Sequence, residues 1–308
     1  MIDVASPPPP STDAEVPSGA YALLTIARDE ADNLSAMLDA VERQSVPPLL
    51  WVVVENDSAD DSWALIEKHL ATTRIPAFVP IRTSFAGTYE VGSKYARIMA
   101  YALARAQEQH EYSRCDYIGI LDADCIPESG YYKKLLALLE RQAGLGILSG
   151  VQRDRESGNR AGYGADDWPR GNCRLWRRRC LEDTGYPTGI SADAQTVAKA
   201  EMRGWQVATA QDAVVYCRPT GDGKTPEYYG HAAYALGVPA GWALAKTVAY
   251  LPRRPRWAYW YGMGYARAWL RRQERVEDPE VRGYFRQYGA RMIRRKLTHA
   301  CRVGARSR

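Results

Sequence analysis

Two carboxylates at the end of a predicted buried strand carry the clearest chemistry in this chain. Asp122 and Asp124 come directly after the apolar run at residues 117–121, and they form the only Asp-x-Asp in the sequence. Hard cations such as Mg²⁺ are commonly held by one or two carboxylates, with water and substrate phosphates as the other ligands. The pair therefore predicts a divalent-metal site that carries a nucleotide diphosphate. An ordinary acidic loop after a strand is the alternative.

The residues around this pair alternate between short apolar runs and amphipathic helical patterns. The apolar runs predict strands, and the 3.6-residue spacing of apolar side chains predicts helices. Strands are expected at 21–27, 49–54, 78–82, 117–121 and 146–151, and helices at 32–44, 60–69, 89–108 and 130–141. Continuous apolar strands separated by helices indicate an α/β fold with a parallel sheet that is covered on both faces.

Polar clusters follow the first two expected strands as well. Residues 28–30 read Arg-Asp-Glu and residues 55–58 read Glu-Asn-Asp-Ser. In open α/β sheets, ligands bind beyond the carboxyl ends of the strands, so three polar clusters on one sheet edge indicate a nucleotide site. Taken singly, each cluster is also an ordinary turn, because Asn, Asp and Ser favour turns. Neither G-x-G-x-x-G nor a P-loop is present, so a metal has to neutralise the phosphates.

The order and spacing of these clusters, over residues 20–218, resemble the family-2 inverting glycosyltransferases of the GT-A fold. The resemblance implies a Rossmann-like, mostly parallel sheet with flanking helices and a nucleotide-sugar donor. Ala27 and Glu30 match the family's first-strand ending, which binds the donor. Asn56 stands where the family has an acid that hydrogen-bonds the base. An Asn side chain both accepts and donates, so the preferred base is left open.

The same resemblance assigns the phosphate and metal side of the site. Residues 92–97 are similar to the family's third-helix stretch, which brings a basic residue near the base and phosphates; Arg97 is the closer match and Lys94 the alternative. The resemblance then implies that Asp122 contacts the ribose, that Asp124 is the main metal ligand, and that Asp122 also takes part in binding the metal. The implied cofactor is Mg²⁺ or Mn²⁺. The third protein ligand is open, since Cys217 stands where a His is expected.

The acceptor side is implied further along the chain. Trp168 and Asn172 lie in a segment that looks like the family's acceptor-side loop, which leads into a short helix expected over 174–181. Asp193 opens a helix that is expected to run to Arg203, and it matches the family's general base, although Ala192 replaces the usual Glu. Helix-start electrostatics is the alternative for Asp193, because an acid in the first turn complements the helix dipole.

Composition limits the class of protein. The chain has 308 residues, of which 46% are hydrophobic, so it can bury a sizeable core. No stretch approaches the roughly 20 apolar residues of a spanning helix. Six cysteines show no C-x-x-C pair or zinc spacing, which favours a reducing cytoplasm. We expect a disordered, Pro-rich lead at 1–18, a catalytic domain at 19–225 and a helical region at 226–308.

The C-terminal region differs in charge from the rest. Residues 251–308 carry 16 Lys/Arg and 4 Asp/Glu, and the last 18 residues carry seven Lys/Arg and no acid. Trp and Tyr side chains alternate with arginines over 256–275. Such helices suit the headgroup region of a membrane, but they also suit packing against the catalytic domain. Nucleic-acid binding is disfavoured, because no nucleic-acid motif accompanies the basic residues.

These observations predict a metal-dependent hexosyltransferase that transfers a sugar from a nucleotide-diphosphate donor to a hydroxyl of a lipid-linked or polysaccharide acceptor. The expected location is cytoplasmic, at the inner face of the cell membrane, where the basic tail would contact anionic lipids during cell-envelope glycan synthesis. A non-catalytic nucleotide- or membrane-binding protein on the same scaffold is the alternative, because a fold does not fix a function.

Overall fold

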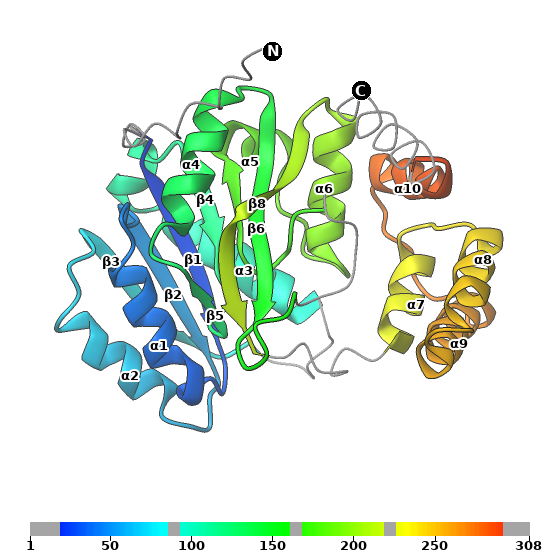
Figure 1. The fold of residues 1–308 in the computed structure, drawn as a ribbon, viewed down its shortest axis with the longest axis horizontal. Helices are drawn as coiled ribbons and strands as arrows, with labels where there is room; N and C mark the ends of the chain where they lie inside the picture. Colours follow the sequence, from blue (N-terminus) through cyan, green and yellow to red (C-terminus); the bar gives the residue numbers. More distant parts are fainter. Residues whose placement is uncertain (1–18, 86–92, 161–167, 219–225, 292–308) are drawn as a thin grey trace, which may run out of the picture.

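The computed structural model describes residues 19–85, 93–160, 168–218 and 226–291 (Figure 1). The expected lead at 1–18 and most of the basic tail at 292–308 lie outside these residues. The strands are β1 (Tyr21–Ala27), β2 (Leu50–Asn56), β3 (Ala77–Thr83), β4 (Tyr117–Ile120), β5 (Cys125–Pro127), β6 (Leu145–Asp154), β7 (Arg174–Arg177) and β8 (Gln206–Cys217).

Helices cover both faces of the sheet formed by these strands (Figure 1). The α-helices of the sheet-containing part are α1 (Ala31–Glu42), α2 (Ser62–Leu70), α3 (Ser93–Gln107), α4 (Tyr131–Arg141), α5 (Arg178–Thr184) and α6 (Ala192–Met202), and a short 3-10 helix spans His110–Arg114. Buried residues of α1, α2 and α4 form one hydrophobic cluster with the sheet, and those of α3, α5 and α6 form a second. The α/β fold predicted from the sequence is confirmed.

The sheet has the order β3-β2-β1-β4-β7-β6-β8-β5. β1, β2, β3 and β4 are parallel neighbours, and β6 runs parallel to β8. β7 is antiparallel to both β4 and β6, and β5 is antiparallel to β8. All seven residues of β1 are buried, and its apolar side chains are divided between the two clusters, so the strand is apolar on both faces except for Thr25.

One expected element has a different structure. The short helix predicted over 174–181 begins only at Arg178, because residues 174–177 form β7 and fill the space between β4 and β6. Both edges of β7 are paired, so backbone hydrogen bonds to two neighbouring strands outweigh the local preference of these four residues for a helix. β8 begins at Gln206 and contains a register shift opposite Gly150 and Val151.

Beyond residue 226 the described chain is helical, as expected. It contains α7 (Pro226–Ala235), α8 (Ala240–Tyr250), α9 (Pro255–Leu270) and α10 (Pro279–Arg286). α7, α8 and α9 share one hydrophobic cluster, whereas α10 packs with α6 of the sheet-containing part. Figure 1 shows α8 and α9 at the end of the molecule opposite to α2. Among the described residues, every helix is too short or too polar to cross a membrane.

Two glycines allow the close crossing of α7 and α9. A Cβ atom on Gly230 of α7 would collide with the carbonyl oxygen of Tyr261, and a Cβ atom on Gly264 of α9 would collide with that of Glu227. The obstacles are backbone atoms of the opposite helix, so they cannot be relieved by a side-chain rotation.

We predict that Gly264→Ala separates α9 from α7 and lowers the free energy of unfolding by about 1–3 kcal/mol, the usual cost of overpacking. The matched control is Gly283→Ala in α10, where an added Cβ meets no heavy atom within 4 Å. The control should be neutral or slightly stabilising, since Ala is the better helix former. Urea unfolding of both variants checks this, and equal midpoints would contradict the close-crossing argument.

Candidate active site at the carboxyl ends of the strands

The sheet topology brings the predicted polar clusters to one edge. β1, β2 and β4 are parallel, so Glu30, Asn56 and Asp122 all follow strands that end on the same side. The loops after β1 and β2 are joined directly, because the backbone N–H of Asp29 donates to Ser58 Oγ at 3.1 Å and that of Glu30 donates to Ser62 Oγ at 3.0 Å. The predicted convergence of these clusters is therefore present, and Ser58 acts within it as a turn residue.

Arg218 connects the first cluster to the acidic pair. Its Nη2 lies 2.6 Å from Glu30 Oε1, and its Nε lies 2.9 Å from Asp124 Oδ2. Burial raises the pKa of Glu30, and the neighbouring charge of Asp124 adds to this rise. Burial also lowers the pKa of Arg218, but Asp124 and Glu30 outweigh that effect and raise it overall. The structure makes Arg218 the counter-ion of two site carboxylates.

Asp122 is held by a residue that the sequence analysis did not single out. The hydroxyl of Tyr95, in the first turn of α3, donates a hydrogen bond to Asp122 Oδ1. Burial raises the pKa of Tyr95 well above its ordinary value, and the charge of Asp122 adds to the rise, so the phenol stays protonated and remains a donor. The only available signal in the sequence was the position of Tyr95 between the two basic residues already considered, Lys94 and Arg97.

Asp193 lies in the first turn of α6, with its side chain exposed. The residue two positions earlier, Ser191, has a left-handed backbone with φ 52° and ψ 47°, a conformation that non-glycine residues adopt at an energetic cost. A Cβ atom on Gly171 would lie only 3.0 Å from Asp193 Oδ2. The absence of a side chain at residue 171 therefore leaves room for the Asp193 carboxylate.

The buried guanidinium of Arg174 fixes this carboxylate-bearing turn. Arg174 is the first residue of β7, and its Nη1 donates to the backbone oxygen of Asp193 at 3.0 Å and to Thr196 Oγ1 at 3.1 Å. Its Nη2 and Nε donate to the backbone oxygens of Pro169 and Arg170 at 2.9 and 2.8 Å. Arg174 thus ties the 169–170 loop to the start of α6, and sequence reasoning did not identify it.

The acidic pair and Asp193 both lie next to one short segment. The backbone N–H of Asp122 donates to the backbone oxygen of Asn172 at 2.9 Å, and a Cβ atom on the preceding residue, Gly171, would meet the Asp193 side chain. The Asn172 amide donates to Cys125 Sγ at 3.3 Å and accepts from Gln152. The side chain of Asn172 is therefore hydrogen-bonded to two other side chains of the protein, those of Cys125 and Gln152.

The remaining predicted residues are placed as follows. Asn56 is 1% exposed; its Oδ1 accepts from the backbone N–H of Phe85 at 2.9 Å, while its Nδ2 has no partner within the described part of the chain. Lys94 is buried at the start of α3, whereas Arg97 is exposed on the same helix. Ala27 is buried at the end of β1, and Trp168 packs partly buried between α6 and the sheet-containing core.

The donor set suits a hard divalent cation only if the substrate supplies ligands. Among the described residues, no group of three or more His, Cys, Asp or Glu side chains is arranged to hold a metal. Asp122 and Asp124 nevertheless give two carboxylates, which is the number that Mg²⁺ sites commonly use together with water and phosphates. The residues present therefore fit a metal that is bound together with a diphosphate. In this structure, Arg218 is the cation that pairs with Asp124.

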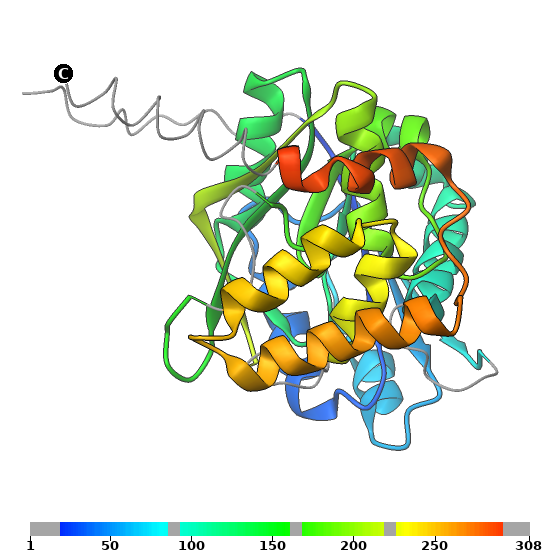
Figure 2. The same ribbon diagram turned by 90° about the vertical axis from the view of Figure 1, so that its right-hand side faces the viewer.

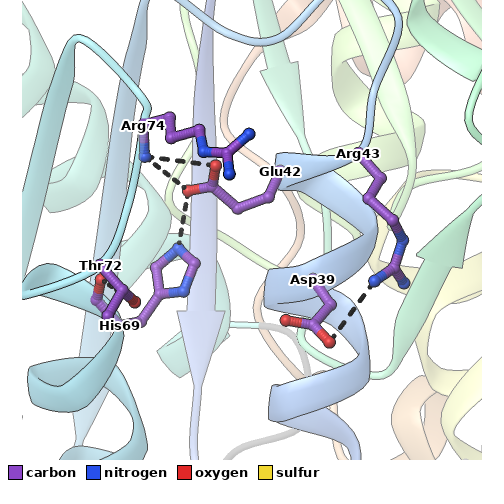
Figure 3. A pocket seen from close by; sticks show the side chains of 6 residues that line it. All are labelled: Asp39, Glu42, Arg43, His69, Thr72 and Arg74. Carbon is purple, nitrogen blue, oxygen red and sulfur yellow. Dashed lines mark hydrogen bonds and ion pairs between the residues drawn. The ribbon is translucent and has the colours of Figure 1, made fainter.

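A cavity of about 260 Å³ lies elsewhere, between the C-terminal parts of α1 and α2 (Figure 3). Its Glu42 carboxylate contacts His69 Nε2 at 3.2 Å and accepts from the backbone N–H of Arg74 at 3.3 Å. These contacts satisfy the carboxylate locally. The cavity lies at the C-terminal ends of the helices that follow β1 and β2, so it is separate from the strand ends that carry the site.

We predict that Arg218→Gln increases the affinity for Mn²⁺ alone by about tenfold, because Asp124 and Glu30 lose a competing cation. Electron paramagnetic resonance of free Mn²⁺ measures the affinity without any substrate. Arg82→Gln is the matched control, since Arg82 ends β3 at the same edge but pairs with Glu55 at 3.4 Å. An unchanged or weaker Mn²⁺ affinity in Arg218→Gln would contradict a cation site at Asp124.

Comparison with known proteins agrees with this geometry. Among solved structures, the fold resembles the mannosyltransferase PcManGT from Pyrobaculum calidifontis in complex with GDP-Man and Mn²⁺, with TM-score 0.57 and 20% identity over 86% of this chain and 92% of that chain. It also resembles S. aureus TarS 1-349 in complex with UDP, with TM-score 0.51 and 13% identity over 70% of this chain and 65% of that one.

These similarities establish the GT-A fold. A search of curated protein sequences finds no match. The family model described as glycosyl transferase family 2 matches residues 23–192, which is more than half of the chain and includes most of β1 and the acidic pair, and ends at Ala192, the first residue of α6. The chain therefore belongs to glycosyl transferase family 2.

Proposed function

We propose that this glycosyltransferase is a metal-dependent, inverting hexosyltransferase that acts on a lipid-linked or polysaccharide acceptor. One observation carries the proposal: the Asp122–Asp124 pair and Asp193 both lie next to the short segment 171–172. A base at the attacking hydroxyl and a cation at the departing diphosphate would each assist one direct displacement at the anomeric carbon.

On the donor side, the nucleotide sugar binds along the ends of β1, β2 and β4. Ala27 and Glu30 border it, Asn56 contacts the base, and Asp122 contacts the ribose. Arg97, or Lys94 in its place, approaches the base and phosphates. The buried Nδ2 of Asn56 is a hydrogen-bond donor without a described partner, which supports a base contact there.

Asp124, with Asp122, holds Mg²⁺ or Mn²⁺. When bound, the ion neutralises charge on the departing diphosphate. The solved structures of PcManGT and of GalNAc-T7 with UDP, GalNAc and Mn²⁺ support a divalent ion for this chain too. Arg218 moves from Asp124 to the diphosphate, which offers a second anionic partner to the same guanidinium.

On the acceptor side, the exposed carboxylate of Asp193 accepts the proton of the acceptor hydroxyl. The hydroxyl oxygen forms a bond to the anomeric carbon while the bond from that carbon to the diphosphate breaks, and the electron pair leaves with the nucleoside diphosphate. One direct displacement inverts the configuration. Trp168 and Asn172 border the acceptor, which is a glycan presented in polymeric or lipid-linked form at the cytoplasmic face of an anionic membrane during cell-envelope glycan synthesis.

We predict that Asp193→Asn keeps donor affinity and loses turnover on the order of 10²–10⁴-fold, which is the usual contribution of a general base. Asp32→Asn is the matched control, because Asp32 is an exposed acid in the first turn of α1. Both substitutions remove a helix-dipole interaction, but only Asp193 has a proposed catalytic role. Release of nucleoside diphosphate measures turnover, and equal turnover in the two variants would assign Asp193 to helix-dipole stabilisation alone.

We also predict that Asp124→Ala abolishes metal-dependent donor binding and leaves the fold intact, since the side chain lies after a strand and not in the core. A thermal-shift series with UDP-, GDP- and dTDP-sugars, with and without Mn²⁺, measures donor binding through ligand stabilisation. The parent should show a Mn²⁺-dependent shift with at least one donor. The same shift in Asp124→Ala would remove this residue from the metal site.

A further inference from the structure

The outer side of α8 is apolar along its whole length. Leu244, Val248 and Leu251 follow one another at helical spacing on this side, and they are 65%, 58% and 52% exposed. The only charged side chain of the helix, Lys246, lies over the rings of Trp257 and Tyr261 on α9, at 5.4 and 4.8 Å from their centroids. The charge of α8 is therefore directed to α9, and the outer side carries only apolar groups.

α9 continues this exposed apolar surface. It lies beside α8, as Figure 2 shows, and it exposes Tyr259, Trp269 and Leu270. Single exposed apolar side chains are normal on a protein surface, but several large ones on two adjacent helices are typical of an interaction site. We call the exposed apolar residues of α8 and α9 and the arginines next to them the α8–α9 face.

The charged residues of this part of the chain are mostly basic. Residues 228–273 contain seven Lys/Arg and no Asp/Glu, with Glu227 and Glu274 on either side of the stretch. Arg253, Arg254 and Arg256 are exposed where α8 joins α9, and Arg271 and Arg272 are exposed just after α9. Arg267, within α9, pairs with Glu227. The apolar surface is thus bordered at both ends of α9 by exposed arginines.

We infer that the α8–α9 face binds the surface of an anionic lipid bilayer, with the apolar side chains at the boundary of the acyl chains and the arginines among the headgroups. Amphipathic helices with basic borders and exposed Trp, Tyr and Leu bind membranes in this way. The helices lie on the bilayer and do not cross it, in keeping with the lengths of the described helices. The inference rests on the proposed function, since it supplies the surface that meets a membrane-presented acceptor.

Charge decides between a bilayer and a second copy of the chain as the occupant of this face. In a two-fold symmetric dimer the same patch meets itself, so the exposed arginines of two copies would face each other with no acid in residues 228–273 to pair with. An anionic bilayer supplies the opposite charge. The sheet-containing part is not the occupant either, because α10 is the helix of this region that packs with α6, while α8 packs with α9 and α7.

Vesicle sedimentation tests the apolar part of the face. The parent should bind vesicles of phosphatidylcholine with 30% phosphatidylserine, and Leu244→Gln/Val248→Gln should lose at least about tenfold in affinity, because two exposed apolar contacts with the acyl boundary are lost. The control is Leu70→Gln, which removes a 48% exposed leucine from α2 at the opposite end of the molecule. The control should bind vesicles like the parent.

A second pair of variants tests the charges. Arg253→Gln/Arg254→Gln should lose about 10- to 30-fold in affinity for the anionic vesicles, given the usual contribution of each basic residue near such a surface. Lys68→Gln/Arg74→Gln removes two exposed charges at the α2 end and should lose far less. Added salt should reduce the difference, because the attraction is screened within about 10 Å.

Donor hydrolysis in the absence of vesicles is measured for every variant, and it should stay at the parental level. If the parent binds vesicles but does not hydrolyse any donor, the proposed function is refuted and the membrane-binding role of the α8–α9 face is retained. That role is refuted if Leu244→Gln/Val248→Gln binds vesicles like the parent, or if deletion of residues 292–308 alone removes all binding. A concentration-dependent dimer that this double variant abolishes would assign the face to a second copy instead.

Discussion

The buried guanidinium of Arg174 must find hydrogen-bond acceptors, because its charge is removed from water, and the acceptors that it finds hold the site together. Burial lowers its pKa, and its donors are directed to three backbone oxygens and one hydroxyl. These acceptors belong to the 169–170 loop and to the first turn of α6. Loss of this contact would leave both segments without their common attachment, and the proposed base, Asp193, would lose its fixed backbone. A buried charge held by four hydrogen bonds fixes its partners closely, and removal of one partner of a buried charge is strongly destabilising.

A second electrostatic arrangement governs the donor side. Glu30 and Asp124 come from loops far apart in the sequence, and their mutual repulsion is offset by the single guanidinium of Arg218 between them. The pKa of Glu30 is raised by burial and by the charge of Asp124. Arg218 provides the positive charge that both carboxylates share.

The helices after residue 226 follow a different packing rule. α7 and α9 approach closely through Gly230 and Gly264, and Tyr261 and Tyr265 of α9 are buried in the cluster that these helices share. Leu244 and Val248 of α8 and Trp269 of α9 remain exposed. The contact therefore holds α7 and α9 together without burying the side chains that make up the α8–α9 face.

The sequence alone determined five of the eight described strands, the sheet edge that carries the polar clusters and the family, because these depend on local periodicity and on the ordered spacing of a few motifs. An apolar run such as residues 21–27 is predicted as a buried strand from its own composition. Neighbouring parallel strands then have their carboxyl ends at the same edge of the sheet. The tertiary structure alone decided that residues 174–177 form a strand, since that outcome needs β4 and β6 on both sides. It also decided the partners Tyr95 with Asp122 and Arg218 with Glu30, which lie 27 and 188 residues apart. No local pattern encodes such pairs, because burial and charge proximity arise only when distant segments are packed together.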